Sequence, residues 1–379
     1  MMRYRLVLAR LFLPTLLLSA LLGVPAEAKE VRTLKTGEPA PELNLPGVDG
    51  KTYRLKDFED AEVLVVVFTC NHCPTAQAYE DRLNQLYEDY HDKGVALVAV
   101  TSNDPLALRL DELGYSDVGD SLEDTKLHAK RRGFKFPYLY DGDTQRVATA
   151  YGALTTPHVF VFDRARKTRY NGRIDDADVK PPKSHDLRNA VDDLLAGREV
   201  RVPTTRVFGC STKWSDKRES VKKAIEQWNK EPVELETIDE AGLRKLVAND
   251  TKNYRLINVW ATSCIPCVTE LPELVTVNRM YRRRNFEFIT LSLDSPDRRE
   301  EASKFLKKYH VSSKNYIFHS DDRDKLAEAL DPKWKGPVPY TILIAPGGEI
   351  IGRWEEELDF AKLKAEIVER LGRTYASRK

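Results

Sequence analysis

The sequence predicts an α/β protein with two domains, each built on a mixed central sheet flanked by helices. Two stretches repeat one order of signals: an apolar β-branched run, two cysteines separated by two residues, an amphipathic segment and a second apolar run. Continuous apolar runs are typical of strands buried on both faces of a sheet. A strand, a crossover helix and a parallel strand form a βαβ unit. With 379 residues, the chain is long enough for each unit to have its own core.

The first repeat starts with the strand Ala61–Thr69, "AEVLVVVFT", which leads directly into Cys70. Its second strand is Val95–Val100, "VALVAV". The segment between the strands has the spacing of an amphipathic helix, with one face formed by Tyr79, Leu83, Leu86 and Tyr90.

The second repeat has a strand at Arg255–Thr262, a helix at Val268–Arg284 and a second strand at Phe286–Asp294. Each repeat is followed by an X-Pro step that opens another apolar strand, at Thr155–Asp163 and at Gly336–Ala345. Each of these later strands runs into a turn and a further strand, which should pair with it antiparallel.

Amphipathic helices at Asp186–Leu195 and Phe360–Leu371 close the two domains. We therefore expect a first domain (domain 1) at 36–200, a tail and linker at 201–235, and a second domain (domain 2) at 236–374.

The N-terminal 28 residues have the pattern of a secretory signal peptide. Arg3 and Arg5 precede the apolar run Leu11–Val24, and a small-residue cleavage motif ends at Ala28. An uncleaved anchor is the alternative, but the run is shorter than the roughly 20 residues that a spanning helix needs. We expect cleavage, a periplasmic or secreted protein, and no stable membrane insertion afterwards. The formal charge of +1 is close to neutral, so composition does not indicate a nucleic-acid partner.

The five cysteines follow a pattern that favours redox chemistry over a set of structural disulfides. An exported protein can keep disulfides. An odd number of cysteines in a large chain, mostly arranged as C-x-x-C pairs, does not fit a framework of structural disulfides. The five are Cys70, Cys73, Cys210, Cys264 and Cys267.

Each pair lies where a buried strand ends and a helix opens. A helix N-terminus favours a thiolate, so we expect it to lower the pKa of the first cysteine of each pair. The second cysteine could then attack a mixed disulfide formed on the first. A Cys₄ zinc site is the alternative, but its two halves are usually found within one small module, whereas these pairs lie in separate domains.

The second half resembles the TlpA/ResA-type thiol–disulfide reductases through "NVWATSCIPCVTELPEL" and the later "GPVPYTILIA". The resemblance implies a thioredoxin-like fold, with Cys264 as the attacking thiol and Cys267 as the resolving thiol. A cis Pro339, together with Trp260, would border the substrate groove. Ser263 stands where the family usually has tryptophan, which should make the rim less apolar.

Glu270 matches the acid that these reductases place near the dithiol, and it is the better candidate for proton handling because Asn258 replaces the buried Asp of classical thioredoxins. The alternative for Glu270 is a solvated first-turn acid favoured by the helix dipole.

The first half resembles AhpC/TSA-type redoxins, which are also thioredoxin-like, through "FTCNHCP", "TTPHVFVFD" and the tail motif "FGCSTKW". The resemblance implies that Pro157 is cis and faces the Cys70–Cys73 pair. That group often has a cysteine where this chain has Thr155. Cys210, in the tail motif, is either a structural cysteine or a third thiol that resolves domain 1.

Thiol peroxidase activity is an alternative for domain 1, because Cys73-Pro74-Thr75 is similar to the peroxiredoxin T-x-x-C-P motif. Cys70, however, occupies the place of the peroxiredoxin threonine.

His72 distinguishes the two pairs. A cationic imidazole beside a thiolate stabilises the reduced form and makes a stronger oxidant, so we expect CNHC to be more oxidising than CIPC. A solvent-facing His72 of little influence is the alternative. Cu(I) held by the thiols and His158 is a further alternative, although Sco-type copper chaperones space their cysteines as C-x-x-x-C.

The sequence thus predicts an exported thiol–disulfide oxidoreductase with antioxidant relatives, acting through redox-active disulfides without a cofactor or metal. Its expected partners are protein dithiols or disulfides, with a membrane electron donor as a further candidate.

Overall fold

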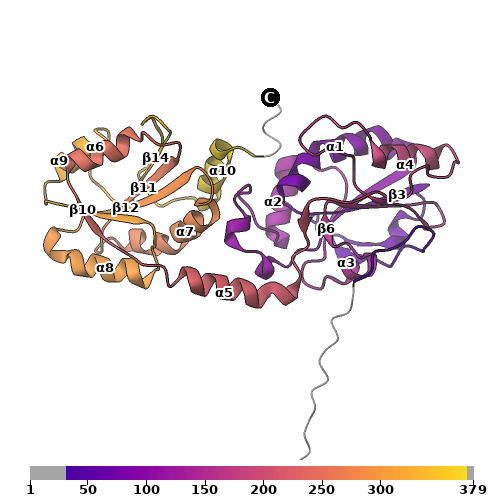
Figure 1. Ribbon diagram of the computed structural model, residues 1–379, viewed down its shortest axis with the longest axis horizontal. Coiled ribbons are helices and arrows are strands. Elements are labelled where there is room, and N and C mark those ends of the chain that lie inside the picture. The colour runs from indigo at the N-terminus through magenta and orange to yellow at the C-terminus, as the bar shows by residue number, and fades with distance from the viewer. Residues whose placement is uncertain (1–30, 374–379) are drawn as a thin grey trace, which may run out of the picture. The chain divides into compact units, whose positions relative to one another are not determined.

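The computed structural model of the protein describes residues 31–373 (Figure 1). The signal peptide predicted at 1–28 lies outside these residues. Among the helices that are described, none combines the length and the apolar character needed to cross a membrane. Two larger sheets, of five and six strands, organise the described chain. The predicted α/β fold with mixed sheets flanked by helices is confirmed.

The sheet of domain 1 has the order β5-β4-β3-β7-β8. Its central strand β3 pairs parallel with β4 and antiparallel with β7, and all seven of its residues are buried. This burial on both faces explains the unbroken apolar run in the sequence. The strands are β3 (Val63–Thr69), β4 (Val95–Thr101), β5 (Tyr138–Tyr140), β7 (His158–Phe162) and β8 (Thr168–Gly172).

Helices cover both faces of this sheet. Val63, Val65 and Val67 pack in one core cluster with side chains of α1 and α4. Leu64 and Val66 pack with α3 on the other face, as the alternation along a strand requires. The helices are α1 (Pro74–Tyr90), α2 (Leu122–Arg132), α3 (Arg146–Tyr151) and α4 (Asp186–Leu195).

Two short antiparallel pairs complete domain 1. One is a hairpin of β1 (Asn44–Pro46) and β2 (Thr52–Arg54). The other joins β6 (Thr155–Thr156) to β9 (Cys210–Ser211), so the tail motif returns to domain 1 after the end of α4. The linker that follows contains α5 (Arg218–Trp228).

The sheet of domain 2 has the order β10-β13-β12-β11-β14-β15. Strand β11 again lies between a parallel neighbour, β12, and an antiparallel one, β14. The strands are β10 (Glu236–Ile238), β11 (Tyr254–Trp260), β12 (Phe286–Ser292), β13 (Lys314–Phe318), β14 (Tyr340–Ile344) and β15 (Ile350–Trp354).

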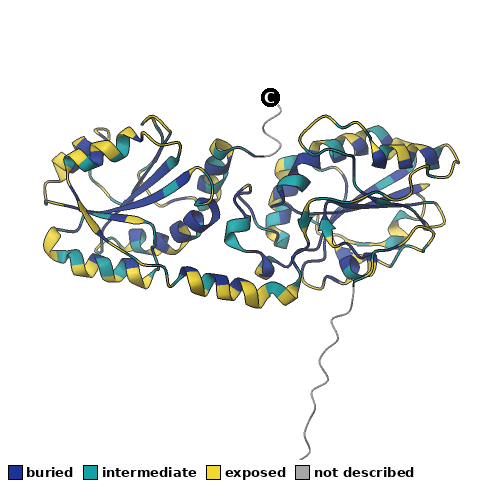
Figure 2. Cartoon of the chain, in the orientation of Figure 1, coloured by how far each residue is buried: buried dark blue, intermediate teal, exposed yellow. Residues whose placement is uncertain are grey.

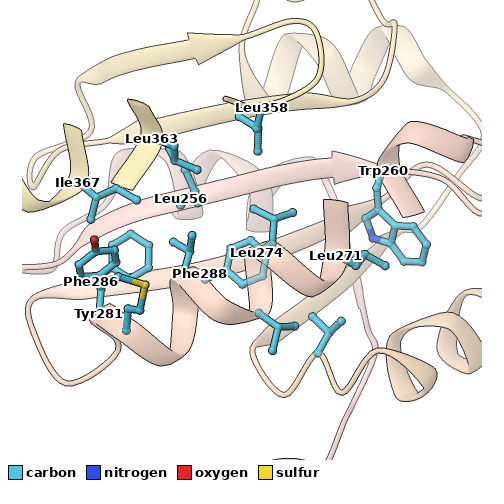
Figure 3. Close-up of a cluster of buried hydrophobic side chains, with 14 of the residues drawn as sticks. Leu256, Trp260, Leu271, Leu274, Tyr281, Phe286, Phe288, Leu358, Leu363 and Ile367 are labelled. Atoms are coloured by element: carbon cyan, nitrogen blue, oxygen red, sulfur yellow. The ribbon is translucent and has the colours of Figure 1, made fainter. Parts of the chain in front are cut away.

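The helices of domain 2 cover its sheet in the same way. Leu256 and Trp260 share a core cluster with Leu271 of α7 and Leu363 of α10 (Figure 3). Ile257 faces the opposite side, where α6 and α9 pack. The central strands are buried along their length, whereas the flanking helices expose their outer faces (Figure 2). The helices are α6 (Glu240–Ala248), α7 (Ile265–Tyr281), α8 (Arg299–Lys308), α9 (Arg323–Leu330) and α10 (Phe360–Leu371).

Candidate active sites at the two cysteine pairs

In domain 2, Cys264 is the N-cap residue of α7, which begins at Ile265. Its Sγ accepts a hydrogen bond of 3.3 Å from the backbone N–H of Cys267, one turn into the helix. The first N–H groups of a helix have no partner within the helix, so a sulfur at the N-cap satisfies one of them and is stabilised as a thiolate. The two cysteines form a disulfide with a Cα–Cα distance of 5.3 Å. Cys264 is partly exposed, whereas Cys267 is fully buried.

Glu270 lies one further turn along α7, on the face of Cys267. Glu270 is buried, so the alternative that it is a solvated acid in the first helical turn is wrong. Oε1 accepts a hydrogen bond of 2.6 Å from the backbone N–H of Leu358, and the buried Oε2 has no hydrogen-bond partner within the described residues. Burial raises the pKa of Glu270, against the hydrogen bond from Leu358, and the nearby charge of Glu357 adds to the increase. This carboxyl group can therefore carry a proton.

In domain 1 the helix begins three residues later relative to the cysteine pair. Helix α1 starts at Pro74, so its N-cap residue is Cys73, the second cysteine. Hydrogen bonds from the thiols of Cys210 and Cys70 lower the pKa of Cys73 well below its usual value of 9.0, although burial opposes this. The backbone N–H of Ala76 and the charge of His72 lower it further. Our expectation that the first cysteine has the lowered pKa is therefore wrong for domain 1.

Cys70 has the opposite electrostatic environment. It lies before the helix and is buried, and burial raises its pKa well above 9.0. The Cys73 sulfur and the charge of Asp120 contribute to the increase. Its Sγ lies 3.2 Å from the hydroxyl oxygen of Thr156, in the residue that precedes Pro157. The environment thus favours the protonated thiol at Cys70 and the thiolate at Cys73.

His72 is also buried, so the alternative of a solvent-facing histidine is wrong. Its Nδ1 lies 2.6 Å from Oδ2 of Asp120, a carboxylate that is itself fully buried. Burial disfavours the charged imidazole, but the charge and hydrogen bond of Asp120 outweigh it and raise the pKa of His72. Burial likewise opposes the charge of Asp120, but His72, the side chain of Asn103 and the backbone N–H of Asn71 keep the pKa of Asp120 below its usual value. Asp120 thereby favours the charged form of His72 beside Cys73.

The third thiol of domain 1 lies against this pair. Cys210 packs on the cluster of Cys70, Cys73 and Ala76 and hydrogen-bonds to the Cys73 sulfur. That hydrogen bond and burial raise the pKa of Cys210, whereas the charge of Lys213 opposes the increase. Cys73 is therefore the sulfur that contacts both other thiols.

A model of the AhpC/TSA family matches residues 36–171 and 229–353, more than half of the chain. The chain belongs to the AhpC/TSA family. Its two matched regions hold the two cysteine pairs described above.

Two curated relatives of this chain are thiol-disulfide oxidoreductases named ResA. That of Geobacillus thermodenitrificans (strain NG80-2) is 28% identical over 172 residues, which are 44% of this chain and 87% of the relative. That of Oceanobacillus iheyensis is 30% identical over 95 residues, and the chain spans only 45% of its length.

Two solved structures are each similar to about half of this chain. A hypothetical protein, SMc02350, from Sinorhizobium meliloti 1021 is 36% identical, with 48% of this chain and 97% of that chain covered and a TM-score of 0.44. An uncharacterized conserved protein from Geobacillus kaustophilus is 38% identical, with 48% and 93% covered and a TM-score of 0.43.

The remaining predicted site residues have mixed outcomes. The peptide bonds before Pro157 and Pro339 are cis, as expected. Trp260 does not border a groove: it is fully buried in the core of domain 2 beside Leu271, because the last side chain of β11 points to the face that α7 covers (Figure 3). This part of the prediction is wrong.

His158 is engaged away from the thiols. It hydrogen-bonds through Nε2 to Asn171 at 2.7 Å, and burial lowers its pKa to about 4. Among the described residues, the potential metal ligands that lie close together are Cys70, His72 and Asp120. Their ligand atoms are all within 4.8 Å of one another, and His158 is not one of them. The copper set that we considered in the sequence is therefore not assembled.

Sequence reasoning missed three contributors to the domain 1 site: Asp120, Asn103 and Thr156. Asp120 and Asn103 lie in loops that follow His72 by 48 and 31 residues, so no local pattern marks them. The start of α1 did carry a signal, since proline is favoured at the first position of a helix and Pro74 follows Cys73 directly.

The raised pKa of Glu270 predicts a pH dependence of stability. A carboxyl group whose pKa is raised in the folded protein stabilises it below the usual value of 4.5, and this contribution is lost as the pH rises through the folded-state pKa. Each unit of upward shift corresponds to about 1.4 kcal/mol. We expect Glu270→Gln to remove this loss, so that the variant gains stability relative to the wild type as the pH increases.

The measurement is urea unfolding between about pH 4 and about pH 8. Glu273→Gln, which changes an exposed carboxylate on the same helix, is the matched control and should follow the wild type. Parallel stability curves for the wild type and Glu270→Gln would contradict the assignment.

Proposed function

We propose that the protein is an exported thiol–disulfide oxidoreductase that exchanges disulfides with protein substrates through two dithiols. The observation that carries the proposal is the position of Cys264: a partly exposed sulfur at the N-cap of α7, disulfide-bonded to Cys267 and followed by the buried Glu270. The activity named for the ResA relatives supports it. The proposed electron transfer takes place between cysteine sulfurs and needs no cofactor or metal.

Domain 2 would reduce a substrate in two exchange steps. The Cys264 thiolate attacks one sulfur of a substrate disulfide, which forms a mixed disulfide and releases the other substrate sulfur as a thiolate. Cys267 then attacks the Cys264 sulfur, forms the Cys264–Cys267 disulfide and releases the second substrate thiolate. Two electrons pass to the substrate, and a dithiol partner returns them by the reverse sequence.

Glu270 would handle the proton of Cys267. The buried thiol must lose its proton before it can attack, and water has little access to a fully buried sulfur. The unpartnered Oε2 of Glu270 is an acceptor on the same helix face, and its raised pKa makes proton uptake favourable.

Domain 1 would carry out the same exchange from the other cysteine of its pair. Its thiolate is Cys73, and Cys70 is its buried partner thiol. Both sulfurs are less exposed than Cys264, so domain 1 is the less suited of the two to a large protein substrate.

Replacement of the exposed nucleophile tests the proposal for domain 2. We expect Cys264→Ser to lower the rate at which the full chain reduces insulin disulfides, with dithiothreitol as the electron source, by a factor on the order of 100. Ser263→Ala changes the exposed neighbouring side chain and should leave the rate within about two-fold of the wild type. A Cys264→Ser variant that retains the wild-type rate would refute the assignment.

The two pairs should also differ in reduction potential. His72 favours the thiolate of Cys73, which stabilises the reduced form, so domain 1 should be the more oxidising. We expect His72→Asn to make domain 1 more reducing by about 30 mV or more, which corresponds to ~1.4 kcal/mol.

The measurement is equilibration with glutathione buffers in full chains that carry one active pair each. The pair Cys264→Ser/Cys267→Ser reports on domain 1, and Cys70→Ser/Cys73→Ser reports on domain 2. Equal potentials, or a more reducing domain 1, would be incompatible with this role of His72.

Thiol peroxidase activity is a second candidate for domain 1, favoured by the location of the thiolate at Cys73. A Cys73 thiolate would attack a peroxide oxygen, become a sulfenic acid and release water or an alcohol. A second thiol would condense with it, giving a disulfide and water.

Peroxide consumption by the Cys264→Ser/Cys267→Ser chain separates the two candidates. A peroxidase predicts a rate that falls by a factor on the order of 100 on Cys73→Ser but is retained at first turnover on Cys70→Ser. Equal slow rates in both variants would leave domain 1 with disulfide exchange alone.

A further inference from the structure

The tail segment (Phe208–Trp214, "FGCSTKW") is built into domain 1 by contacts that depend on its backbone. Thr156 pairs antiparallel with Cys210, and Thr155 pairs with Ser211. Beyond the paired residues, the N–H of Thr212 donates to the carbonyl of Leu154 at 3.0 Å. The segment therefore adds a strand to the stretch of chain directly before Pro157.

Buried polar groups fix the end of the tail segment. The backbone N–H of Lys213 donates to Oδ1 of Asn103 at 2.8 Å, and its carbonyl accepts from the N–H of Asp104 and from Nε2 of Gln145. Asn103 is the residue whose amide also donates to Asp120, the partner of His72. The tail segment is thus tied to the polar network that surrounds the cysteine pair.

Gly209 allows the tail segment to lie close to Thr156 and Pro157. A Cβ at this position would lie 2.1 Å from the carbonyl oxygen of Thr156 and 3.2 Å from Cδ of Pro157, and its φ of +138° suits only glycine well. This contact brings the next residue, Cys210, against the Cys73 sulfur.

Domain 2 has no comparable strand among the residues described. The three residues before its own cis proline, 336–338, belong to no named strand, and a Cβ on Gly336 would meet no atom within 4 Å. Cys264 of domain 2 is partly exposed, whereas Cys70 and Cys73 are 1% and 0% exposed. An extended peptide commonly binds by adding a strand to a free edge, and in domain 1 the chain's own tail occupies that edge.

We propose that Cys210 is a third redox thiol of domain 1. The tail segment holds it where the sulfur of a protein substrate would lie, and Cys210 replaces Cys70 as the disulfide partner of Cys73. The proposal rests on the proposed function, because disulfide exchange or oxidation must first supply the Cys70–Cys73 disulfide. Cys210 loses its proton and attacks the Cys73 sulfur; the Cys73–Cys210 bond forms, the Cys70–Cys73 bond breaks, and Cys70 leaves and takes up a proton. No electrons are gained or lost, so the step needs no further oxidant.

The geometry selects Cys73 as the shared sulfur. It contacts the thiols of both Cys70 and Cys210. The hydrogen bond to the Cys73 sulfur is the largest cause of the raised pKa of Cys210, and the charge of Lys213 opposes that increase. Domain 1 would then present two alternative disulfides, only one of which locks the tail segment covalently in place.

The test is disulfide mapping by mass spectrometry in the full chain with Cys264→Ser/Cys267→Ser, oxidised by graded glutathione buffers and quenched by alkylation. Cys70 and Cys73 fall in one tryptic peptide and Cys210 in another, so a cross-link between the two peptides reports on Cys210. We expect Cys70→Ser to form this cross-link in a yield about ten-fold or more above that of Cys73→Ser. Absence of the cross-link in Cys70→Ser, or equal yields in the two variants, would overturn the proposal.

Cys210→Ser separates failure of this inference from failure of the proposed function. If Cys210→Ser forms the disulfide within the first peptide while Cys70→Ser forms no cross-link, the proposal for Cys210 fails and the redox role of the pair stands. If neither disulfide forms, the proposed function of domain 1 fails with it.

Gly209→Ala tests the seating of the tail segment with all three cysteines of domain 1 present. Because its Cβ would collide with Thr156, we expect the yield of the cross-link to fall about ten-fold or more. Ser211→Ala, at an exposed position of the same strand, is the matched control and should keep the yield. A Gly209→Ala chain that folds, by circular dichroism, and cross-links like the control would overturn the seating argument.

Discussion

The proposed chemistry of both domains depends on one contact: a sulfur placed at the N-cap of a helix that follows a buried strand. The strand fixes the cysteine in position, since β3 and β11 are buried along almost their entire length. The helix supplies unpaired N–H groups and partial positive charge to whichever sulfur reaches its first turn. The identity of that sulfur therefore decides which thiol we propose as the nucleophile.

The two domains apply this contact to different members of the pair. Helix α7 begins after Cys264, so the proposed nucleophile is the partly exposed first cysteine, and its partner Cys267 lies inside the helix. Helix α1 begins after Cys73, which leaves Cys70 as a buried, protonated thiol outside the helix. Domain 1 then adds a buried histidine paired with Asp120 and a strand of its own tail, both absent from the corresponding described parts of domain 2. One fold thus yields an open dithiol and an enclosed three-thiol site.

Much of the fold could be predicted because its core strands are continuous apolar runs, and α4 and α10 have the predicted bounds. Helices such as α2 and α8 were missed because they are rich in charged residues and bury only a few side chains each. At the sites, the cysteines and Glu270 follow from local motifs, whereas Asp120 reaches His72 only through the tertiary fold. Trp260 was misplaced because its motif names the residue but not the face of β11 to which it points.

The most direct test of this account is a pH titration of the fully reduced chain with ¹³Cβ-labelled cysteine, followed by NMR and assigned by single Cys→Ser variants. The chemical shift of each Cβ reports deprotonation of its own sulfur, without the need for a reagent to reach a buried thiol. The account predicts that Cys73 deprotonates at a lower pH than Cys70, and Cys264 at a lower pH than Cys267. Deprotonation of Cys70 before Cys73 would contradict it.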